Sequence, residues 1–390
     1  MSRLARACLA ALLLLAAATL PGRSAPAQAE YPNQARVVAI GDVHGDLAHF
    51  TQVLRDAGLV DAALRWTGGG THLVQLGDVP DRGPDTREVI RLLQRLKAEA
   101  RAAGGAVHCL IGNHEAMNMY RDLRYVHPGE YAAFATPAER RRQEEGYAAF
   151  VASIKASTPE AQWPAFDAAH RRSWLEKHLV GVQEHAAAWS PRGEIGRWVI
   201  DNPAVLRLGD TLFVHAGLGP GYETGSVEAI NSAVRRALRR PEATAGTLVR
   251  DENGPLWYRG LATNREPEER AHLEKVLTHY KVRRIVVGHT PMPGVILPRF
   301  GARVILADVG LNETYGGGRS CLVLEEGSAF ALHHGTRLEI PTGGTASVVA
   351  YLRRAAALAP GSQPVLRLIR RFEESLTDDE PEAAAGARSE

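Results

Sequence analysis

The sequence predicts an α/β fold. From Arg36 onward, short apolar runs alternate with segments of helical periodicity, a pattern typical of strands joined by helices. Several of the apolar runs end in a Gly-Asp, Gly-Asn or Gly-His pair, which favours a sharp turn where the strand ends. With 390 residues, of which 45% are hydrophobic and 23% charged, the chain is long enough to bury a sizeable core.

The first half of the α/β region contains three predicted strands, at 36–42, 72–78 and 106–111. A helix is expected near 46–58, between the first two strands. The helix after the second strand has the clearest pattern, because Pro84 suits a first helical position and Gly104 stops the helix. Its apolar face comprises Val89, Leu92, Leu93, Leu96 and Ala100.

The alternation then breaks. Residues 117–200 are predicted to form a mainly helical insertion, which is rich in Ala, Arg and Glu and contains four of the six tryptophans. Short β runs between 295 and 340 are expected to form a meander that makes up much of a second sheet. The other elements expected after the insertion are strands at 205–209, 211–215 and 284–288 and a helix at 226–240.

Both ends of the chain have their own character. Residues 341–376 are predicted to be a C-terminal helical extension, and 377–390 to be a disordered acidic tail. Residues 1–29 have the pattern of a secretory signal peptide, because Arg3 and Arg6 precede a short apolar run and small residues follow it. We therefore expect a periplasmic or secreted protein without stable membrane insertion after cleavage; an uncleaved membrane anchor is the alternative.

The charge balance bears on the class of partner. The sequence has 46 Lys and Arg against 44 Asp and Glu, a formal net charge of +2. A protein that binds nucleic acid mainly through the phosphate backbone is generally strongly basic. We therefore expect no nucleic-acid partner.

Five short motifs follow predicted strands: 41–45 (G-D-V-H-G), 77–83 (G-D-V-P-D-R-G), 112–115 (G-N-H-E), 214–218 (V-H-A-G-L) and 287–290 (V-G-H-T). In α/β proteins, ligands bind at the edge of the sheet where the carboxyl ends of the strands lie. The motifs supply carboxylate, amide and imidazole groups without a thiolate, a donor set that suits Mn, Fe or Zn. The candidate metal ligands are Asp42, His44, Asp78, Asn113, His215 and His289.

With these motifs, the chain resembles the calcineurin-like metallophosphoesterases, in particular their phosphoprotein phosphatase branch and most of all the bacterial Shewanella-like protein phosphatases. The resemblance covers 36–340 and implies a four-layer α/β/β/α sandwich with the helical segment as an insertion. It also implies a dinuclear centre. In that centre Asp42 and His44 bind the first metal, Asp78 bridges both, and the second metal is completed by Asn113, His215 and His289.

The resemblance further implies which residues act on the phosphate. His114 and Asp81 would form the general-acid pair, and Arg82 would bind the phosphoryl group. Arg259, in the stretch G-P-L-W-Y-R-G (254–260), would be a second phosphate-binding arginine. The chain departs from the branch at 307–315, where A-D-V-G-L-N-E-T-Y replaces the usual S-A-P-N-Y segment.

The expected function is a metal-dependent phosphomonoester hydrolase, a protein phosphatase that uses in-line attack of a metal-bridging hydroxide on phosphorus. Its substrate would be a phosphorylated protein or a small phosphoester, with Ser/Thr and Tyr phosphate both open. The alternative is a periplasmic nucleotide or diadenosine-polyphosphate hydrolase on the same metal core. A non-enzymatic scaffold is disfavoured, because no ligand position is missing.

Overall fold

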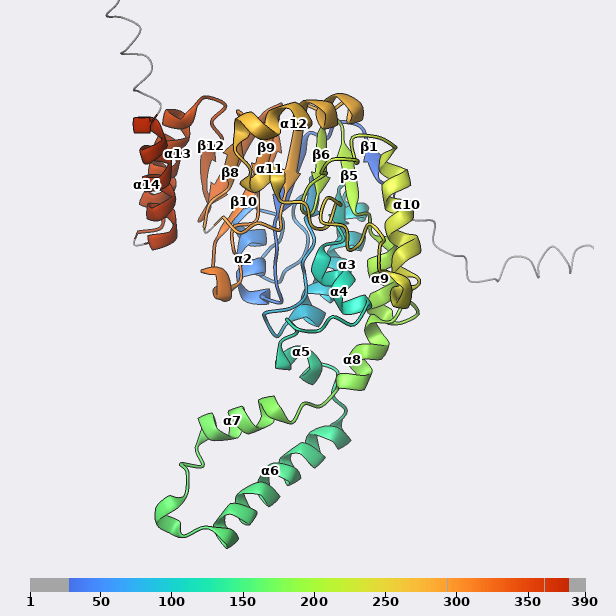
Figure 1. Ribbon diagram of the computed structural model, residues 1–390, viewed down its shortest axis with the longest axis vertical. Coiled ribbons are helices and arrows are strands. Elements are labelled where there is room, and N and C mark those ends of the chain that lie inside the picture. The colour runs from blue at the N-terminus through green and yellow to red at the C-terminus, as the bar shows by residue number, and fades with distance from the viewer. Residues whose placement is uncertain (1–27, 293, 361, 379–390) are drawn as a thin grey trace, which may run out of the picture.

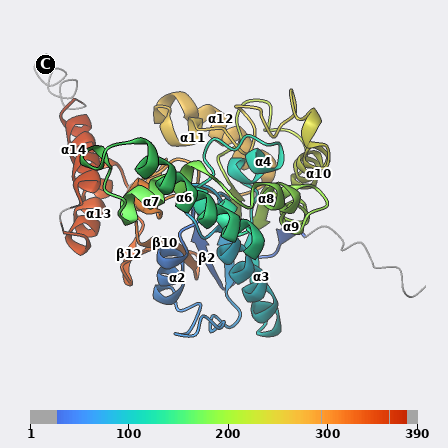
Figure 2. The same cartoon turned by 90° about the horizontal axis from the view of Figure 1, so that it is seen from below.

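The computed structural model describes residues 28–378 except 293 and 361. Over these residues the chain forms two six-stranded sheets that share one hydrophobic core, with helices on the outer sides (Figure 1). In Figure 2, α2 (Leu47–Asp56) and α3 (Thr86–Ala102) lie on one side of the sheets, and α10 (Val227–Leu238) and α12 (Glu266–Tyr280) lie on the other. The predicted α/β/β/α sandwich is confirmed.

One sheet has the strand order β1-β5-β6-β7-β9-β8. Its strands are β1 (Glu30–Tyr31), β5 (Val205–Leu208), β6 (Thr211–Val214), β7 (Arg284–Val287), β9 (Val304–Leu306) and β8 (Leu297–Arg299). The adjacent strands β6, β7 and β9 are parallel. Every residue of these three strands is buried, as expected for strands that are covered on both faces.

The other sheet has the order β12-β11-β10-β2-β3-β4. Its strands are β12 (Thr336–Glu339), β11 (Ser328–His333), β10 (Ser320–Glu325), β2 (Arg36–Ile40), β3 (His72–Gln75) and β4 (Ala106–Cys109). Here β2, β3 and β4 are parallel, so their carboxyl ends lie at a common edge.

The β runs between 295 and 340 do not form the expected single meander in one sheet. β9 pairs parallel with β7, and β8 pairs with β9, so both belong to the first sheet. β10, β11 and β12 are a true meander, but it extends the sheet of β2, because Leu322 of β10 pairs antiparallel with Ala39. The strands of one short segment are thus divided between the two sheets.

The helix after β3 also differs slightly from the prediction. It begins at Thr86, with Asp85 as the N-cap residue, so Pro84 lies before the helix rather than in its first turn. The backbone N–H of Asp85 donates to the carbonyl of Gly45 at 2.9 Å, which fixes the start of the helix against the loop after β2.

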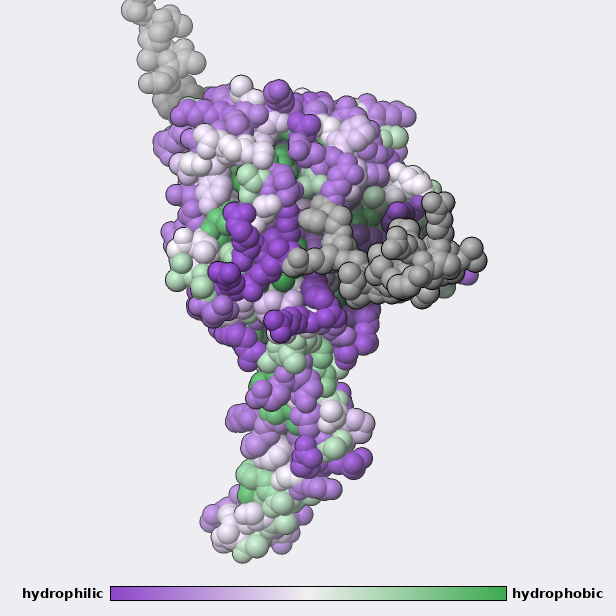
Figure 3. Space-filling view, turned by 90° about the vertical axis from the view of Figure 1, so that its right-hand side faces the viewer, coloured by the Kyte–Doolittle hydropathy of each residue, from purple (hydrophilic) through white to green (hydrophobic). Residues whose placement is uncertain are grey.

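The insertion is mainly helical in the structure. α4 (Asn113–Met119) begins before the insertion and runs into it. The helices that follow are α5 (Pro128–Ala132), α6 (Pro137–Ser157), α7 (Ala168–Lys177), α8 (Val182–Trp189) and α9 (Glu194–Asp201). Neither α6 nor α7 has a buried residue, and together they form an arm that projects from the body (Figures 1 and 3). Trp189 and Trp198, by contrast, are buried in the main core.

The remaining helices are α11 (Gly260–Thr263), α13 (Thr345–Leu358) and α14 (Gln363–Asp378). α13 packs against β12 and α14 packs against α13. α14 includes the first two residues of the predicted tail; 379–390, like 1–27 of the predicted signal peptide, lie outside the described residues. Within the described part of the chain, no helix combines the length and the apolar character needed to cross a membrane.

Candidate metal centre

The candidate ligands follow the carboxyl ends of strands from both sheets. Asp42, Asp78 and Asn113 come after β2, β3 and β4, whereas His215 and His289 come after β6 and β7. The backbone N–H of His289 lies 3.1 Å from both carboxylate oxygens of Asp42. This contact connects the ends of two strands that belong to different sheets, so the site is built at their shared edge.

The backbone at this edge is strained. Five residues with side chains have positive φ: His44 (48°), Asp78 (55°), Asp81 (73°), Arg82 (69°) and His289 (64°). Such conformations cost free energy for any residue other than glycine, and they gather where the surrounding structure holds side chains in place for function. The turns after the strands therefore aim these side chains inward at an energetic cost.

Gly77 allows the strand ends to approach one another. A Cβ atom at this position would lie 2.6 Å from the backbone nitrogen of Gly112 and 2.9 Å from Nδ1 of His215. Gly77 also has φ of +96°, which side chains rarely tolerate. No larger residue fits between the two sheets here.

Two groups of buried donors overlap at one carboxylate. His44, Asp78 and His114 form the first group, and Asp78, His215 and His289 form the second; within each group the donor atoms lie within 4.8 Å of one another. Asp78 Oδ2 is 4.0 Å from His44 Nε2 and 3.3 Å from His215 Nε2. Asp78 thus occupies the position that a bridging ligand requires.

Hydrogen bonds set the tautomers of two histidines. His215 Nδ1 lies 2.8 Å from the carbonyl of Leu76, and His44 Nδ1 lies 3.0 Å from the carbonyl of Pro80. A carbonyl only accepts, so each neutral ring carries its proton on Nδ1 and presents the lone pair of Nε2 to the centre. Metal-binding histidines are commonly oriented in this way.

The remaining donors fit a cation. Asn113 Oδ1 and His289 Nδ1 lie 3.0 and 3.2 Å from His215 Nε2. The Nε2 atom of His289 is buried without a hydrogen-bond partner. An arrangement in which several acceptor atoms converge without a hydrogen-bond donor is energetically unfavourable when the site is empty. It becomes favourable when a metal ion binds between the acceptors.

His114 lies beside this cluster and forms a short hydrogen bond from its ring Nδ1 to the carboxylate of Asp81. Its Nε2 is 3.8 Å from Asp78 Oδ2. Burial disfavours protonation of the ring, but the negative charge of Asp78 and the hydrogen bond to Asp81 outweigh it and raise the pKa of His114. The imidazole is therefore suited to carry a proton.

Two arginines flank the cluster. The guanidinium of Arg82 lies 4.1 Å from the ring centroid of Tyr125 and 5.8 Å from that of Tyr315, and its Nε is buried without a partner. Arg259 Nη1 donates to the carbonyl of His289 at 2.6 Å and to Thr290 Oγ1 at 3.0 Å. The structure thus brings all ten predicted site residues to one edge of the sandwich.

Comparison with known proteins identifies the family. Residues 35–293 match the family of calcineurin-like phosphoesterases. The chain belongs to this family.

Individual relatives agree with this assignment. An uncharacterised protein of Schizosaccharomyces pombe is 33% identical over 77% of this chain and 80% of its own length. Shewanella-like protein phosphatase 2 of Arabidopsis thaliana is also 33% identical, over 73% of this chain and 74% of its own length. The crystal structure of the cold-active protein-tyrosine phosphatase of a psychrophilic Shewanella species is similar, with a TM-score of 0.61 and 27% identity over 81% of this chain and 83% of that one.

These matches confirm the predicted resemblance, and the chain is a hydrolase that acts on phosphoesters. The calcineurin-like phosphoesterases depend on metal, and the His and Asp groups of this chain are able to bind it. The assignment therefore agrees with the donor geometry.

Asp308 lies beside the candidate ligand Asp42 and was not among the residues predicted from the sequence. It is 1% exposed, its Oδ1 accepts from the backbone N–H of Gly310 at 2.9 Å, and its carboxyl group interacts electrostatically with that of Asp42. Burial raises its pKa to about 6. The local signal in the sequence is that Asp308 follows the apolar run of β9, but no glycine directly precedes it, as one precedes Asp42 and Asp78.

The insertion contributes two further residues. Asn118 Nδ2 donates to Asp81 Oδ1 at 2.9 Å, and Glu130 Oε1 accepts from the backbone N–H of Asp81 at 2.8 Å. Nothing local in the sequence indicates these contacts, since Glu130 lies 49 positions from Asp81. The start of the insertion therefore supports the candidate acid pair.

We expect Asp78→Asn to lower the bound metal more than Asn113→Ala, because Asp78 faces both donor groups whereas Asn113 contacts only the second. The measurement is metal content per chain after dialysis, with circular dichroism to verify folding. A folded Asp78→Asn protein that retains wild-type metal content would contradict a shared ligand at this position.

Proposed function

We propose that this phosphoesterase is a dinuclear metal-dependent phosphomonoester hydrolase that acts on phosphorylated proteins. The observation that carries the proposal is the shared carboxylate of Asp78, which faces two groups of buried donors beside the His114–Asp81 pair. The donor set of carboxylates, an amide and imidazoles supports Mn, Fe or Zn as the metals. Asp42 and His44 would hold the first metal, and Asn113, His215 and His289 the second.

When bound, two such ions supply a nucleophile at neutral pH and positive charge near the phosphoryl oxygens. The residues of the chain do the rest. Arg82 and Arg259 each present a planar guanidinium, which is suited to bind two oxygens of one phosphoryl group. Because these groups are fixed before the reaction, they stabilise the charge that develops in the transition state.

His114 would give its proton to the leaving oxygen. Its raised pKa keeps the imidazole protonated at higher pH, and Asp81 holds Nδ1 so that Nε2 faces the centre. Asn118 and Glu130 hold Asp81 in turn. The proton donor is thereby positioned before the substrate arrives.

Two observations support a phosphorylated protein as the substrate, with phosphotyrosine among the accepted residues. The relative from Arabidopsis thaliana is named a protein phosphatase, and the similar Shewanella structure is a protein-tyrosine phosphatase. The half-buried rings of Tyr125 and Tyr315 flank Arg82, and such rings favour contact with an aromatic leaving group. These relatives do not favour the nucleotide or diadenosine-polyphosphate hydrolase.

The test is an activity panel with the full chain loaded with Mn, Fe or Zn. We expect hydrolysis of a phosphotyrosine peptide and a phosphoserine peptide, little activity on diadenosine tetraphosphate, and loss of activity after chelation. Full activity after thorough chelation would refute metal dependence. If the protein prefers diadenosine tetraphosphate, the proposal of a protein substrate is wrong, whereas the proposal of metal-dependent hydrolysis still holds.

His114 and Arg82 are expected to differ in their dependence on the leaving group. An alkyl leaving group needs its proton most, so His114→Asn should lower kcat/KM by about 10²–10⁴-fold on phosphoserine and much less on an activated aryl phosphate. Arg82→Ala removes a contact that every phosphomonoester shares, so it should lower both values and weaken inhibition by phosphate. The four kcat/KM ratios are compared with metal content checked in each variant.

An equal loss on both substrates in a metal-loaded His114→Asn protein would contradict the acid role. The imidazole would then position the phosphate or the nucleophile instead.

We also propose that the chain is exported to a periplasm or secreted, with cleavage after Ala27. Ala29 is 6% exposed, and its carbonyl accepts from the backbone N–H of Arg207 at 2.8 Å, so the chain belongs to the fold from this residue onward. Cleavage after Ala29 would remove this contact beside β1. N-terminal sequencing of the fractionated protein should therefore begin at Gln28, and an intact Met1 in the cytosol would refute export.

A further inference from the structure

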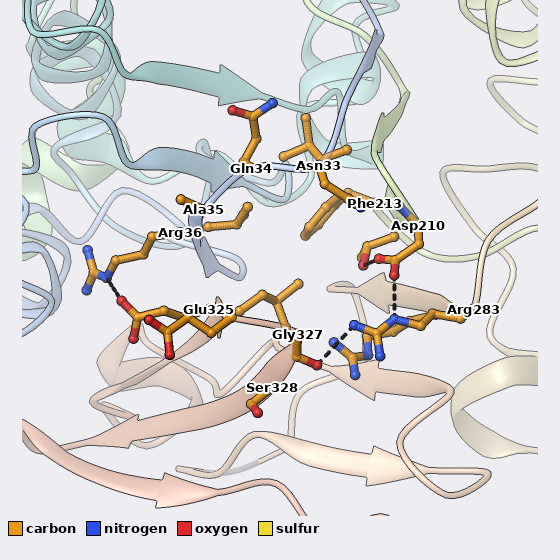
Figure 4. Close-up of a pocket in the computed structure, with 16 residues that line it drawn as sticks. Asn33, Gln34, Ala35, Arg36, Asp210, Phe213, Arg283, Glu325, Gly327 and Ser328 are labelled. Carbon is orange, nitrogen blue, oxygen red and sulfur yellow. Dashed lines mark hydrogen bonds and ion pairs between the residues drawn. The ribbon is translucent and has the colours of Figure 1, made fainter.

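A cavity lies between the two sheets, at the edge where the strands begin. The metal centre lies at the opposite edge. The volume of the cavity is about 330 Å³. The walls come from the chain before and within β2, the β5–β6 turn, the start of β7 and the β10–β11 turn (Figure 4). Both sheets therefore contribute to this pocket.

Strand register shows which side chains face the pocket. Thr211 pairs with Arg284 and Phe213 pairs with Val286 across β6 and β7. Paired residues point to the same face of a sheet, and residues two apart along a strand also share a face. Because Thr211 and Phe213 line the pocket, Arg284 projects from the same inner face and lines it too.

Arg284 is a buried cation without an acidic partner. It is 7% exposed, and its Nε donates to the carbonyl of Ala302 at 3.3 Å. Among the residues that the structure describes, no carboxylate oxygen lies within 4.0 Å of its guanidinium. Burial and the neighbouring charge of Arg283 lower the pKa of Arg284, although Asp210 opposes this.

Two of the three acidic residues that line the pocket, Asp210 and Glu325, are paired with other arginines, and the third, Glu326, is exposed. Asp210 Oδ2 is 2.6 Å from Nε of Arg283, which also donates from Nη2 to the carbonyl of Gly327 at 3.0 Å. Glu325 forms ion pairs with Arg36 at 3.6 Å and with Arg337 at 2.8 Å. Figure 4 shows the ion pairs of Asp210 with Arg283 and of Glu325 with Arg36. Arg284 thus has no ion-pair partner among the described residues, although the charge of Asp210 acts on it from beyond 4.0 Å.

An arginine remains charged even when it is buried, and a buried charge without a counter-ion is unfavourable. An anionic ligand would supply the missing charge. The pocket wall also includes apolar residues, among them Val37, Leu208, Phe213 and Leu324. A ligand that fits both features carries one oxyanion group on a small apolar body.

We propose that this pocket binds a small organic anion, whose carboxylate or phosphate group pairs with Arg284 while its apolar part lies along the apolar part of the pocket wall. The site is separate from the metal centre, and its ligand is not the substrate of the hydrolase. It lies where β2, β6 and β7 begin, and occupancy is expected to stabilise these strands against unfolding.

The test uses benzoate as the anion and benzamide as its neutral counterpart, with thermal unfolding of the full chain as the readout. We expect benzoate to raise Tm in a saturable manner and benzamide to have no effect. Arg284→Gln should weaken benzoate binding about 10-fold or more, because it removes a charge-assisted hydrogen bond. Arg353→Gln is the matched control, since Arg353 is 67% exposed, pairs with Glu373 and does not line the pocket.

Inorganic phosphate is tested in parallel, before and after removal of metals. Stabilisation that persists after chelation and is lost in Arg284→Gln places phosphate in this pocket, whereas stabilisation that requires metal belongs to the metal centre. Equal stabilisation by benzoate and benzamide, or an effect of benzoate that is unchanged in Arg284→Gln, would overturn the proposal.

If Arg284→Gln does not fold, hydrogen–deuterium exchange of the wild-type protein gives a second measurement. Benzoate should protect the turns at 208–211 and 324–328. Protection confined to the loops at 42–45 and 112–115 would overturn the proposal, because it would locate the anion at the metal centre.

Discussion

The carboxylate of Asp78 is the point on which both sheets converge. One oxygen accepts from the backbone N–H of His114 at 2.9 Å, and the other faces the rings of His44, His114 and His215. Burial opposes ionisation of this group, but the nearby imidazoles outweigh it and hold the pKa of Asp78 well below its ordinary value. The negative charge at the centre is therefore maintained by side chains from both sheets, and the strained turns that deliver them serve this one position.

The inserted segment stabilises the loop after β3. Asp81 and Arg82 have φ of 73° and 69°, conformations that persist only where contacts determine them fully. Glu130 and Asn118 bind Asp81, and the carbonyl of Tyr125 accepts from the backbone N–H of Arg82 at 3.0 Å. All three come from the first part of the insertion. Its outer part, the arm of α6 and α7, adds no buried residue and is not needed for these contacts.

Nine of the ten predicted site residues lie in short motifs at the ends of apolar strands, so the sequence could predict that they meet at one edge of the fold. Arg259 follows no strand and was expected only from the family resemblance. The sequence was less informative wherever the partner is distant in the chain. The division of 295–340 between the sheets depends on β9 finding β7 and β10 finding β2, and no local pattern encodes either pairing. Asp308 was missed for a related reason, since its importance comes from contact with Asp42, which is far away in the sequence.

Strand β7 connects the metal centre to the opposite edge of the sheets, where the pocket lined by Arg284 lies. β7 begins with Arg284, continues through three fully buried apolar residues and is followed by Gly288 and His289. At roughly 3.3 Å per residue, the two ends of this strand are separated by little more than 10 Å of apolar core. Along the strand, only the apolar side chains of Ile285, Val286 and Val287 lie between these ends. The metal centre is therefore too far away to compensate the guanidinium of Arg284, and the proposed anion would do so at the edge where the strand begins.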